Sequence, residues 1–172
     1  MSCIINGSAG LTTNSGAVYN SIQSDTAKTA TGTSVDFTSI PSWVKRVTVM
    51  FNGVSTNGSN GQIIQLGSGS FVTSGYLGAA SNQTGSTTTN FSAGFQVNLA
   101  NASADILHSQ IILTLVSANI WGCSFITSLS NGASVRFGSG TISLGGVLDR
   151  VRITTNGGTD TFDAGSINIL YE

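Results

Sequence analysis

Few side chains in this sequence could carry out acid–base or nucleophilic chemistry. His108 is the only histidine, and a Ser-His-Asp arrangement would need the fold to hold a serine and an aspartate beside it. No Gly-x-Ser-x-Gly motif presents a serine in that way. We therefore interpret His108 as an exposed residue at the entrance of a strand, and we expect no catalytic residue.

Metal and thiol chemistry is equally restricted. Cys3 and Cys123 are the only cysteines, and with His108 they are widely separated along the chain, whereas a zinc site needs three or four such ligands that converge. Cys123 alternates with Trp121 and Phe125, which predicts that it points into a core. We expect two free thiols, no metal site and no cofactor.

The aspartates offer two further kinds of site. Asp160 and Asp163 could give carboxylate oxygens to calcium, but their spacing does not match an EF-hand loop, and capping of a turn is the preferred interpretation. A glycosidase would need two carboxylates on facing strands. Because the sequence cannot place Asp36, Asp105 and Asp149 relative to these two, a carbohydrate-active enzyme is kept as a third alternative.

Arg150 and Arg152 are two residues apart and so share one face of a predicted strand. The preferred interpretation is an ion pair with Asp149, Asp163 or Glu172, or an edge strand that its charges protect against unwanted pairing. Ligand binding by these arginines is the alternative.

Composition excludes several classes of protein. Charged residues make up only 8% of the chain and the formal net charge is −1, against about 25% charged residues in an average globular protein. Because no Lys or Arg lies between Val47 and Ala104, no basic surface is available for nucleic acid. No apolar run approaches the roughly 18–20 residues that span a bilayer. We expect a soluble product made in the cytoplasm, with no membrane insertion.

The elements that must position these side chains have the period of β-strands. Hydrophobic residues make up 40% of the chain and fall in short alternating runs, and no segment has a helical period over ten residues. The pattern predicts an all-β protein, an antiparallel β-sandwich or jelly-roll-like domain of ten to twelve short strands. Strands are expected near residues 35–37, 44–51, 62–66, 71–77, 95–99, 111–116, 121–125, 135–137, 142–144, 150–154 and 167–171.

Two segments are expected to differ from this main domain, which covers residues 33–172. Residues 1–32 are rich in Ser, Thr, Asn and Gly and predict an N-terminal arm that makes attachment or oligomer contacts. Short apolar groups along the arm are its candidate contact residues, namely Ile4, Ile5, Leu11, Val18 and Tyr19. Residues 78–92 lack both periodicity and charge and predict a long surface loop.

Two features of the sequence concern its surface and its end. Neutral hydrogen-bonding groups with scattered aromatic side chains can bind carbohydrate by stacking and amide contacts, and can equally form subunit interfaces. In the predicted loop region, Tyr76, Asn82, Gln83 and Asn90 are the candidate receptor-binding residues. Residues 148–172 predict a terminal hairpin, two alternating strands joined by the turn Asn156-Gly157-Gly158.

Residues 31–58 together with residues 148–172, which end in Asp-Ala-Gly-Ser-Ile-Asn-Ile-Leu-Tyr-Glu, resemble the C-terminal domain of tail-fibre-like proteins from tailed bacteriophages and prophages. The resemblance implies a virion structural protein made in the bacterial host and displayed on the particle, without a catalytic motif. It also implies a homotrimer that contacts other virion proteins through residues 1–32 and a host surface glycan through exposed loops. A capsid decoration protein seated at three-fold positions on the head is the alternative to a short tail fibre.

Overall fold

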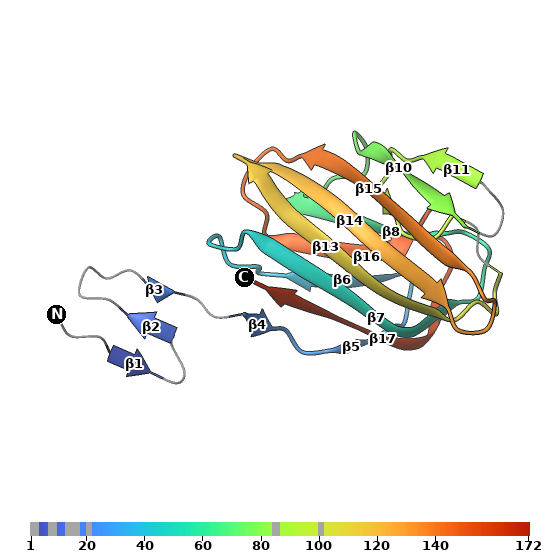
Figure 1. The fold of residues 1–172 in the computed structure, drawn as a ribbon, viewed down its shortest axis with the longest axis horizontal. Helices are drawn as coiled ribbons and strands as arrows, with labels where there is room; N and C mark the ends of the chain where they lie inside the picture. The colour runs from blue at the N-terminus through green and yellow to red at the C-terminus, as the bar shows by residue number, and fades with distance from the viewer. Residues whose placement is uncertain (1–3, 7–9, 13–17, 20–21, 84–86, 100–101) are drawn as a thin grey trace.

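The computed structural model describes residues 4–6, 10–12, 18–19, 22–83, 87–99 and 102–172. Within these ranges the chain forms β-strands and no helix, and every strand pairing is antiparallel (Figure 1). The predicted all-β, antiparallel fold is confirmed. The described residues therefore include no helix that could cross a membrane.

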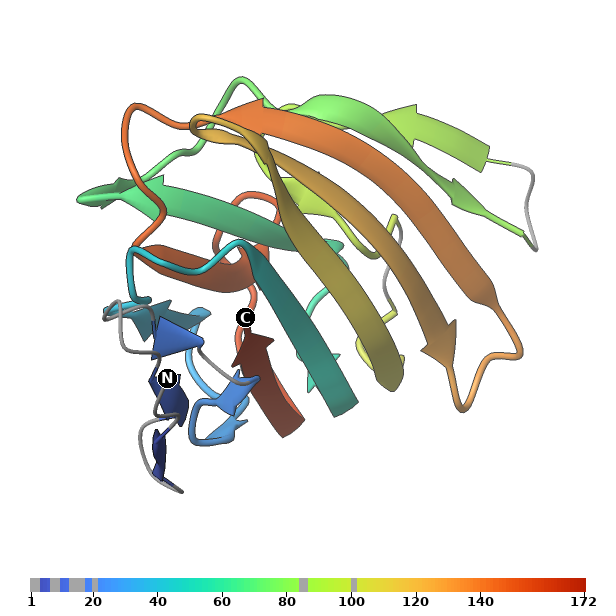
Figure 2. The same ribbon diagram turned by 60° about the vertical axis from the view of Figure 1, so that its left-hand side comes forward.

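Two sheets make up the main body, and they face each other as a β-sandwich (Figure 2). The larger sheet has nine strands in the order β11-β10-β15-β14-β13-β7-β17-β4, with β5 also paired to β17. Its strands are β4 (Gln23–Ser24), β5 (Lys28–Thr29), β7 (Arg46–Thr56), β10 (Leu77–Asn82), β11 (Thr87–Asn90), β13 (Leu107–Ser117), β14 (Ile120–Leu129), β15 (Val135–Ser143) and β17 (Phe162–Tyr171).

The smaller sheet has five strands in the order β12-β8-β16-β6, with β9 also paired to β8. Its strands are β6 (Ser34–Thr38), β8 (Gln62–Ser68), β9 (Ser70–Phe71), β12 (Phe95–Gln96) and β16 (Arg150–Thr155). A separate three-stranded sheet contains β1 (Ile4–Asn6), β2 (Gly10–Thr12) and β3 (Val18–Tyr19).

Eight strands of the sandwich pair in a nested order. In chain order they are β5, β6, β7, β8, β12, β13, β16 and β17, and the first pairs with the last, the second with the seventh, the third with the sixth and the fourth with the fifth. Two antiparallel sheets wound in this way are typical of jelly rolls. The jelly-roll subclass stays a prediction, and the pairing favours it.

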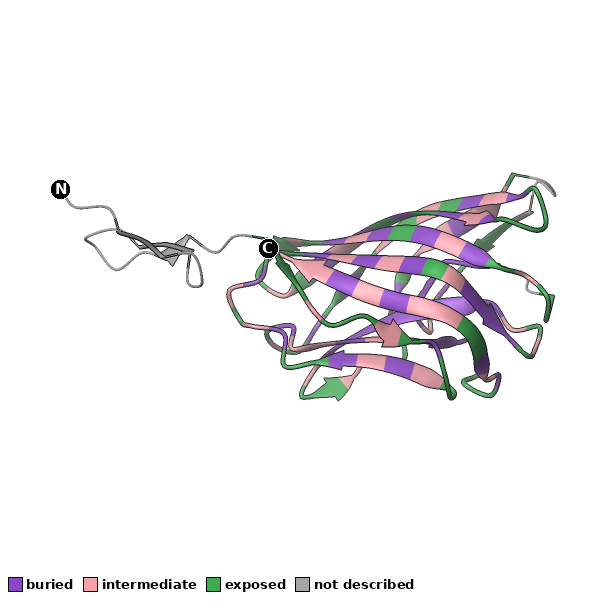
Figure 3. Ribbon diagram, turned by 90° about the horizontal axis from the view of Figure 1, so that it is seen from below, coloured by how far each residue is buried: buried purple, intermediate pink, exposed green. Residues whose placement is uncertain are grey.

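The hydrophobic core lies between the two sheets because strand residues alternate in burial. Val47, Val49 and Phe51 of β7 are buried while the residues between them are not, and the same alternation runs along most of β13 and β14 (Figure 3). Cys123 of β14 lies in this core, as predicted, and burial raises the pKa of its thiol. Cys3 lies outside the described residues.

The prediction of a surface loop over residues 78–92 is wrong for most of that segment. Residues 77–82 and 87–90 form the antiparallel hairpin of β10 and β11, and β10 pairs with β15. Small residues occur here because large ones would not fit. A Cβ at Gly140 of the paired strand β15, for example, would lie 2.9 Å from the ring of Phe91. The sequence shows neither alternation nor charge here because the hairpin covers an inner face built from glycine and alanine.

The terminal hairpin predicted for residues 148–172 is also wrong. Both strands exist, but β16 pairs with β6 and β8 in the smaller sheet, and β17 pairs with β7, β4 and β5 in the larger one. The turn at Asn156-Gly157-Gly158 carries positive φ at both glycines, as expected, yet it begins a crossover between sheets. The chain ends inside a sheet, as the pattern predicted.

Two further expectations need adjustment. The stretch from β6 to β17 contains twelve strands, within the predicted number, but β7 and β13 each run for 11 residues and are not short. In the predicted arm, β4 and β5 pair with β17, so the residues from Gln23 onward belong to the larger sheet. The candidate contact residues Ile4, Ile5, Leu11, Val18 and Tyr19 lie in β1 to β3, of which the structure describes the backbone.

Candidate functional site

Tyr76 is not exposed, contrary to expectation. It is 1% exposed, its ring packs edge-on against Phe95 with the centroids 4.9 Å apart, and its hydroxyl donates to the carbonyl of Val72 at 3.1 Å and accepts from the amide of Leu66 at 2.7 Å. This side chain joins the segment after β9 to β8. It cannot stack on a ligand at the surface.

Stability at alkaline pH should reflect this burial. Desolvation raises the pKa of Tyr76 from 10.0 to about 12, so the unfolded chain loses this proton first, and the stabilisation present below pH 10 is lost as the pH rises to 12. We expect the free energy of unfolding in urea to fall by about 2–3 kcal/mol over this window. Tyr76→Phe should be less stable at pH 8 by about 1–2 kcal/mol and should lose this part of the pH dependence; an unchanged slope would contradict the assignment.

The other three candidate receptor residues do not form one site. Asn82, at the end of β10, accepts a hydrogen bond from Ser134 Oγ at 2.9 Å, and Gln83 follows it as an exposed residue. Asn90 is exposed at the end of β11, where it pairs with Ala79, so it lies three residues along the hairpin from Asn82, or roughly 10 Å. Asn90 lines a hollow that contains neither Asn82 nor Gln83.

The candidate catalytic and metal residues have structural environments. His108 lies near the start of β13, as predicted, but it is half-buried and not exposed. Asp160 accepts from the amide nitrogen and the side chain of Asn60, both at 2.7 Å, and so caps a turn in another part of the chain; Asp163 accepts from Ser55 Oγ. No group of three His, Cys, Asp or Glu side chains that could hold a metal ion occurs in the part of the chain that the structure describes.

The two arginines of β16 form ion pairs, but not both with the expected partners. Arg150 pairs with Asp149, as predicted, at 2.7 Å, and its hydrogen bond lowers the pKa of that carboxyl group. Arg152 pairs with Asp36 of β6 through Nε at 2.8 Å and Nη2 at 2.7 Å, a partner that the sequence did not indicate. The outer face of the smaller sheet is therefore charged.

The outer face of the larger sheet differs from this charged surface. Two adjacent cross-strand rows cross it, and neither contains Asp, Glu, Lys, Arg or His. One row is Leu170, Thr48, Ile112, Ser124, Ser139, Ala79 and Asn90; the other is Asn168, Met50, Gln110, Ile126, Phe137, Ser81 and Thr88. We call these two rows the uncharged face.

Large apolar side chains are prominent on the uncharged face. Ile126 and Phe137 are cross-strand neighbours that are 63% and 49% exposed, although burial of such side chains would be favourable by about 1.5–3 kcal/mol each. Beside Phe137 lies a shallow hollow of about 370 Å³. Contiguous exposed apolar groups of this kind mark interaction surfaces.

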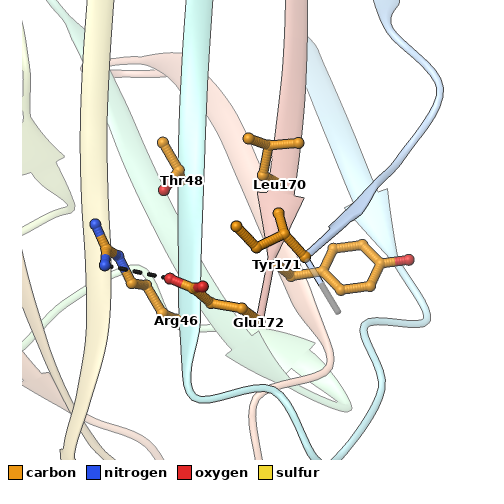
Figure 4. Close-up of a pocket in the computed structure, with 6 residues that line it drawn as sticks. Arg46, Thr48, Leu170, Tyr171 and Glu172 are labelled. Carbon is orange, nitrogen blue, oxygen red and sulfur yellow. Dashed lines mark ion pairs between the residues drawn. The ribbon is translucent and has the colours of Figure 1, made fainter. Parts of the chain in front are cut away.

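At one end of this face two formal charges neutralise each other. Arg46 and Glu172 pair at 3.2 Å beside Thr48 and Leu170 (Figure 4). Together with Ile22 and Tyr171 these residues line a hollow of about 250 Å³. Both side chains are half-exposed. Because their charges are opposite, the pair adds no net charge at the edge of the face.

A second surface lies on the outer side of the smaller sheet, where two hollows adjoin. The larger, of about 360 Å³, is lined by Thr33, Ser34, Ile63, Gln65, Thr73, Ala93, Arg152, Thr154, Thr155, Gly157 and Gly158; we call it the Arg152 hollow. The smaller, of about 150 Å³, is lined by Ile63, Thr89, Asn90, Phe91, Ser92, Ala93, Gly94, Gln96 and Asn156; we call it the Asn90 hollow. The sequence indicated Asn90 and offered Arg152 as an alternative ligand-binding residue. The other lining residues could not be predicted, because their proximity depends on the strand order of the sheet.

No protein-family model and no curated protein matches this chain.

Proposed function

We propose that this chain is a non-enzymatic structural protein on the surface of a tailed-bacteriophage virion, a short trimeric tail-fibre-like protein that binds a host receptor. The observation that carries the proposal is the uncharged face of the nine-stranded sheet. Its apolar side chains and absence of formal charge are features that distinguish the centre of a subunit interface from ordinary protein surface.

A second copy of the chain is the partner that fits this face best. Nucleic acid would require basic groups, and a strongly charged protein partner would meet no opposite charge there. Ser, Thr, Gln and Asn side chains between the apolar ones can donate and accept alike, so two copies of such a surface match without a specific charge pattern. In a cyclic trimer each interface joins two different patches on neighbouring copies, and neutral groups that donate and accept allow this match as well.

The resemblance of residues 31–58 and 148–172 to tail-fibre-like domains supports the trimer and the virion location. It also supports the receptor role, since a trimer joined through the uncharged face leaves free the Arg152 hollow, which contains no residue of that face. On this proposal, residues 1–32 connect the trimer to another virion protein and the sandwich faces the host.

Location in the particle tests the proposal. Immunogold labelling of the virus or induced prophage that encodes the chain should place a few to tens of copies at the tail, and antibody against the chain should block adsorption to cells. Hundreds of copies on the head would instead identify a capsid decoration protein at three-fold positions. Absence of the chain from purified particles would overturn both assignments.

A further inference from the structure

Arg152 is held in place by other side chains, but some of its N–H donors have no hydrogen-bond partner. Asp36 holds its guanidinium through Nε and Nη2, and the ring of Phe71 lies under it with the centroid 4.1 Å from Cζ. A guanidinium has five N–H donors, and the two on Nη1 have no partner among the described residues. The ion pair compensates the charge, so the hollow offers fixed donors beside a carboxylate acceptor and no free cation.

The remaining polar groups of the hollow are also neutral and only partly used. Gln65 donates from Nε2 to the carbonyl of Ala93 at 2.9 Å, which leaves its side-chain oxygen as an acceptor. Thr154 donates to the carbonyl of Thr33 at 2.8 Å. Thr155 also lines the hollow, but it is 1% exposed and its hydroxyl, which has no hydrogen-bond partner in the described part of the chain, is buried.

Rigid elements hold most of these groups. Arg152, Thr154 and Thr155 come from β16 and Gln65 from the neighbouring β8, so their spacing is set by the sheet. Sites built on strands keep their geometry better than sites built on loops. The hollow is therefore formed in advance of any ligand, which lowers the entropic cost of binding.

The Asn90 hollow continues this site. Ile63 and Ala93 line both hollows, so the two adjoin across a short apolar ridge. Together they reach the range of about 300–1,000 Å³ that is usual for ligand sites. Two adjoining hollows, each with polar groups in its lining, suit a chain of linked units better than a single compact molecule.

We propose that the two adjoining hollows bind a neutral oligosaccharide. Each sugar hydroxyl can both donate and accept, which matches paired Asp36 and Arg152 and the amide and hydroxyl groups around them. The apolar C–H face of a sugar ring can lie on Ala93, which is half-buried. Acidic glycans and phosphorylated ligands are disfavoured because Asp36 already neutralises Arg152. This inference rests on the proposed receptor-binding function and assigns its site and ligand class.

Binding of the whole protein to an array of bacterial-type oligosaccharides, neutral and uronic-acid-containing in matched lengths, tests the inference. The neutral glycans that bind are then titrated by calorimetry with Thr73→Trp, which obstructs the Arg152 hollow, and Arg152→Lys, which keeps the charge but removes the guanidinium donors. Thr38→Trp is the matched control, because Thr38 is exposed on the same sheet and lines neither hollow. Melting temperatures establish that each variant is folded.

Both hollow variants should weaken neutral-glycan binding at least tenfold, and Thr38→Trp should bind like the wild type. Neutral-glycan binding that both hollow variants retain would overturn the site while leaving the receptor function standing. Binding of uronic-acid glycans alone would overturn the ligand class. If no glycan binds but the protein still attaches to host cells, the glycan inference fails and the receptor function survives; if neither occurs, both fail.

Discussion

Replacing Gly165 with alanine is expected to destabilise the protein by about 3 kcal/mol or more, because two costs coincide at this position. Gly165 has a φ of +88°, a conformation that disfavours any residue with a Cβ. A Cβ there would also overlap the carbonyl oxygen of Gly53 on the neighbouring strand β7. The positive φ and the contact with Gly53 both involve backbone atoms, so rotation of a side chain cannot relieve either cost. Urea unfolding at neutral pH measures the change.

A matched variant separates the two costs. Gly69 has a similar φ of +71°, but no atom lies within 4 Å of a Cβ placed there. Gly69→Ala should therefore show only the conformational cost, about 1 kcal/mol. Equal effects of the two substitutions would show that the close approach of β17 to Gly53 has no energetic weight.

Gly165 gives a physical meaning to the Asp163-Ala164-Gly165-Ser166 segment. The register between β17 and β7 shifts on both sides of Ala164, so the segment forms an irregular, bulged part of the last strand. Bulges bend a strand and increase its twist. The geometry of the sheet thus explains Gly165 and also Asp163, whose carboxylate accepts from Ser55 at the same place.

The sequence could predict strands but not their partners. Alternation such as Val47, Val49 and Phe51 depends only on local geometry, so it identified the core face of β7. The terminal hairpin failed because Asn156-Gly157-Gly158 reports a sharp change of direction and does not report which sheet the next strand joins. Strand pairing depends on contacts between distant residues, and nothing in a single sequence records them.

The same limit applies to the candidate site. Arg152 and Asp36 are 116 residues apart, and they meet only because β16 pairs with β6. Tyr76 was expected at the surface as one of the aromatic side chains scattered among neutral polar residues, yet the amide of Leu66 and the carbonyl of Val72 satisfy its hydroxyl inside the core. Local polarity predicted exposure, and tertiary packing decided otherwise.

Ile126→Glu is expected to convert the proposed trimer into monomers at micromolar concentration. On the uncharged face this residue lies beside Gln110 and Phe137, and neither row of that face contains a basic side chain that could pair with a new carboxylate. Burying an unpaired charge in an interface costs several kcal/mol, which corresponds to at least a hundredfold weaker association. Multi-angle light scattering behind size-exclusion chromatography measures the mass over a range of protein concentrations.

Val147→Glu is the matched control, because Val147 is 54% exposed and lies outside both cross-strand rows. It should keep the mass of the wild type, and both variants should keep the melting behaviour of a folded sandwich, since neither side chain belongs to the core. A trimer that persists in Ile126→Glu would contradict the assignment of the uncharged face as the subunit interface. A wild-type chain that is monomeric at micromolar concentration would remove the trimer itself. The uncharged face would then need a different partner. The proposal of a trimeric tail-fibre-like protein would lose the observation that carries it.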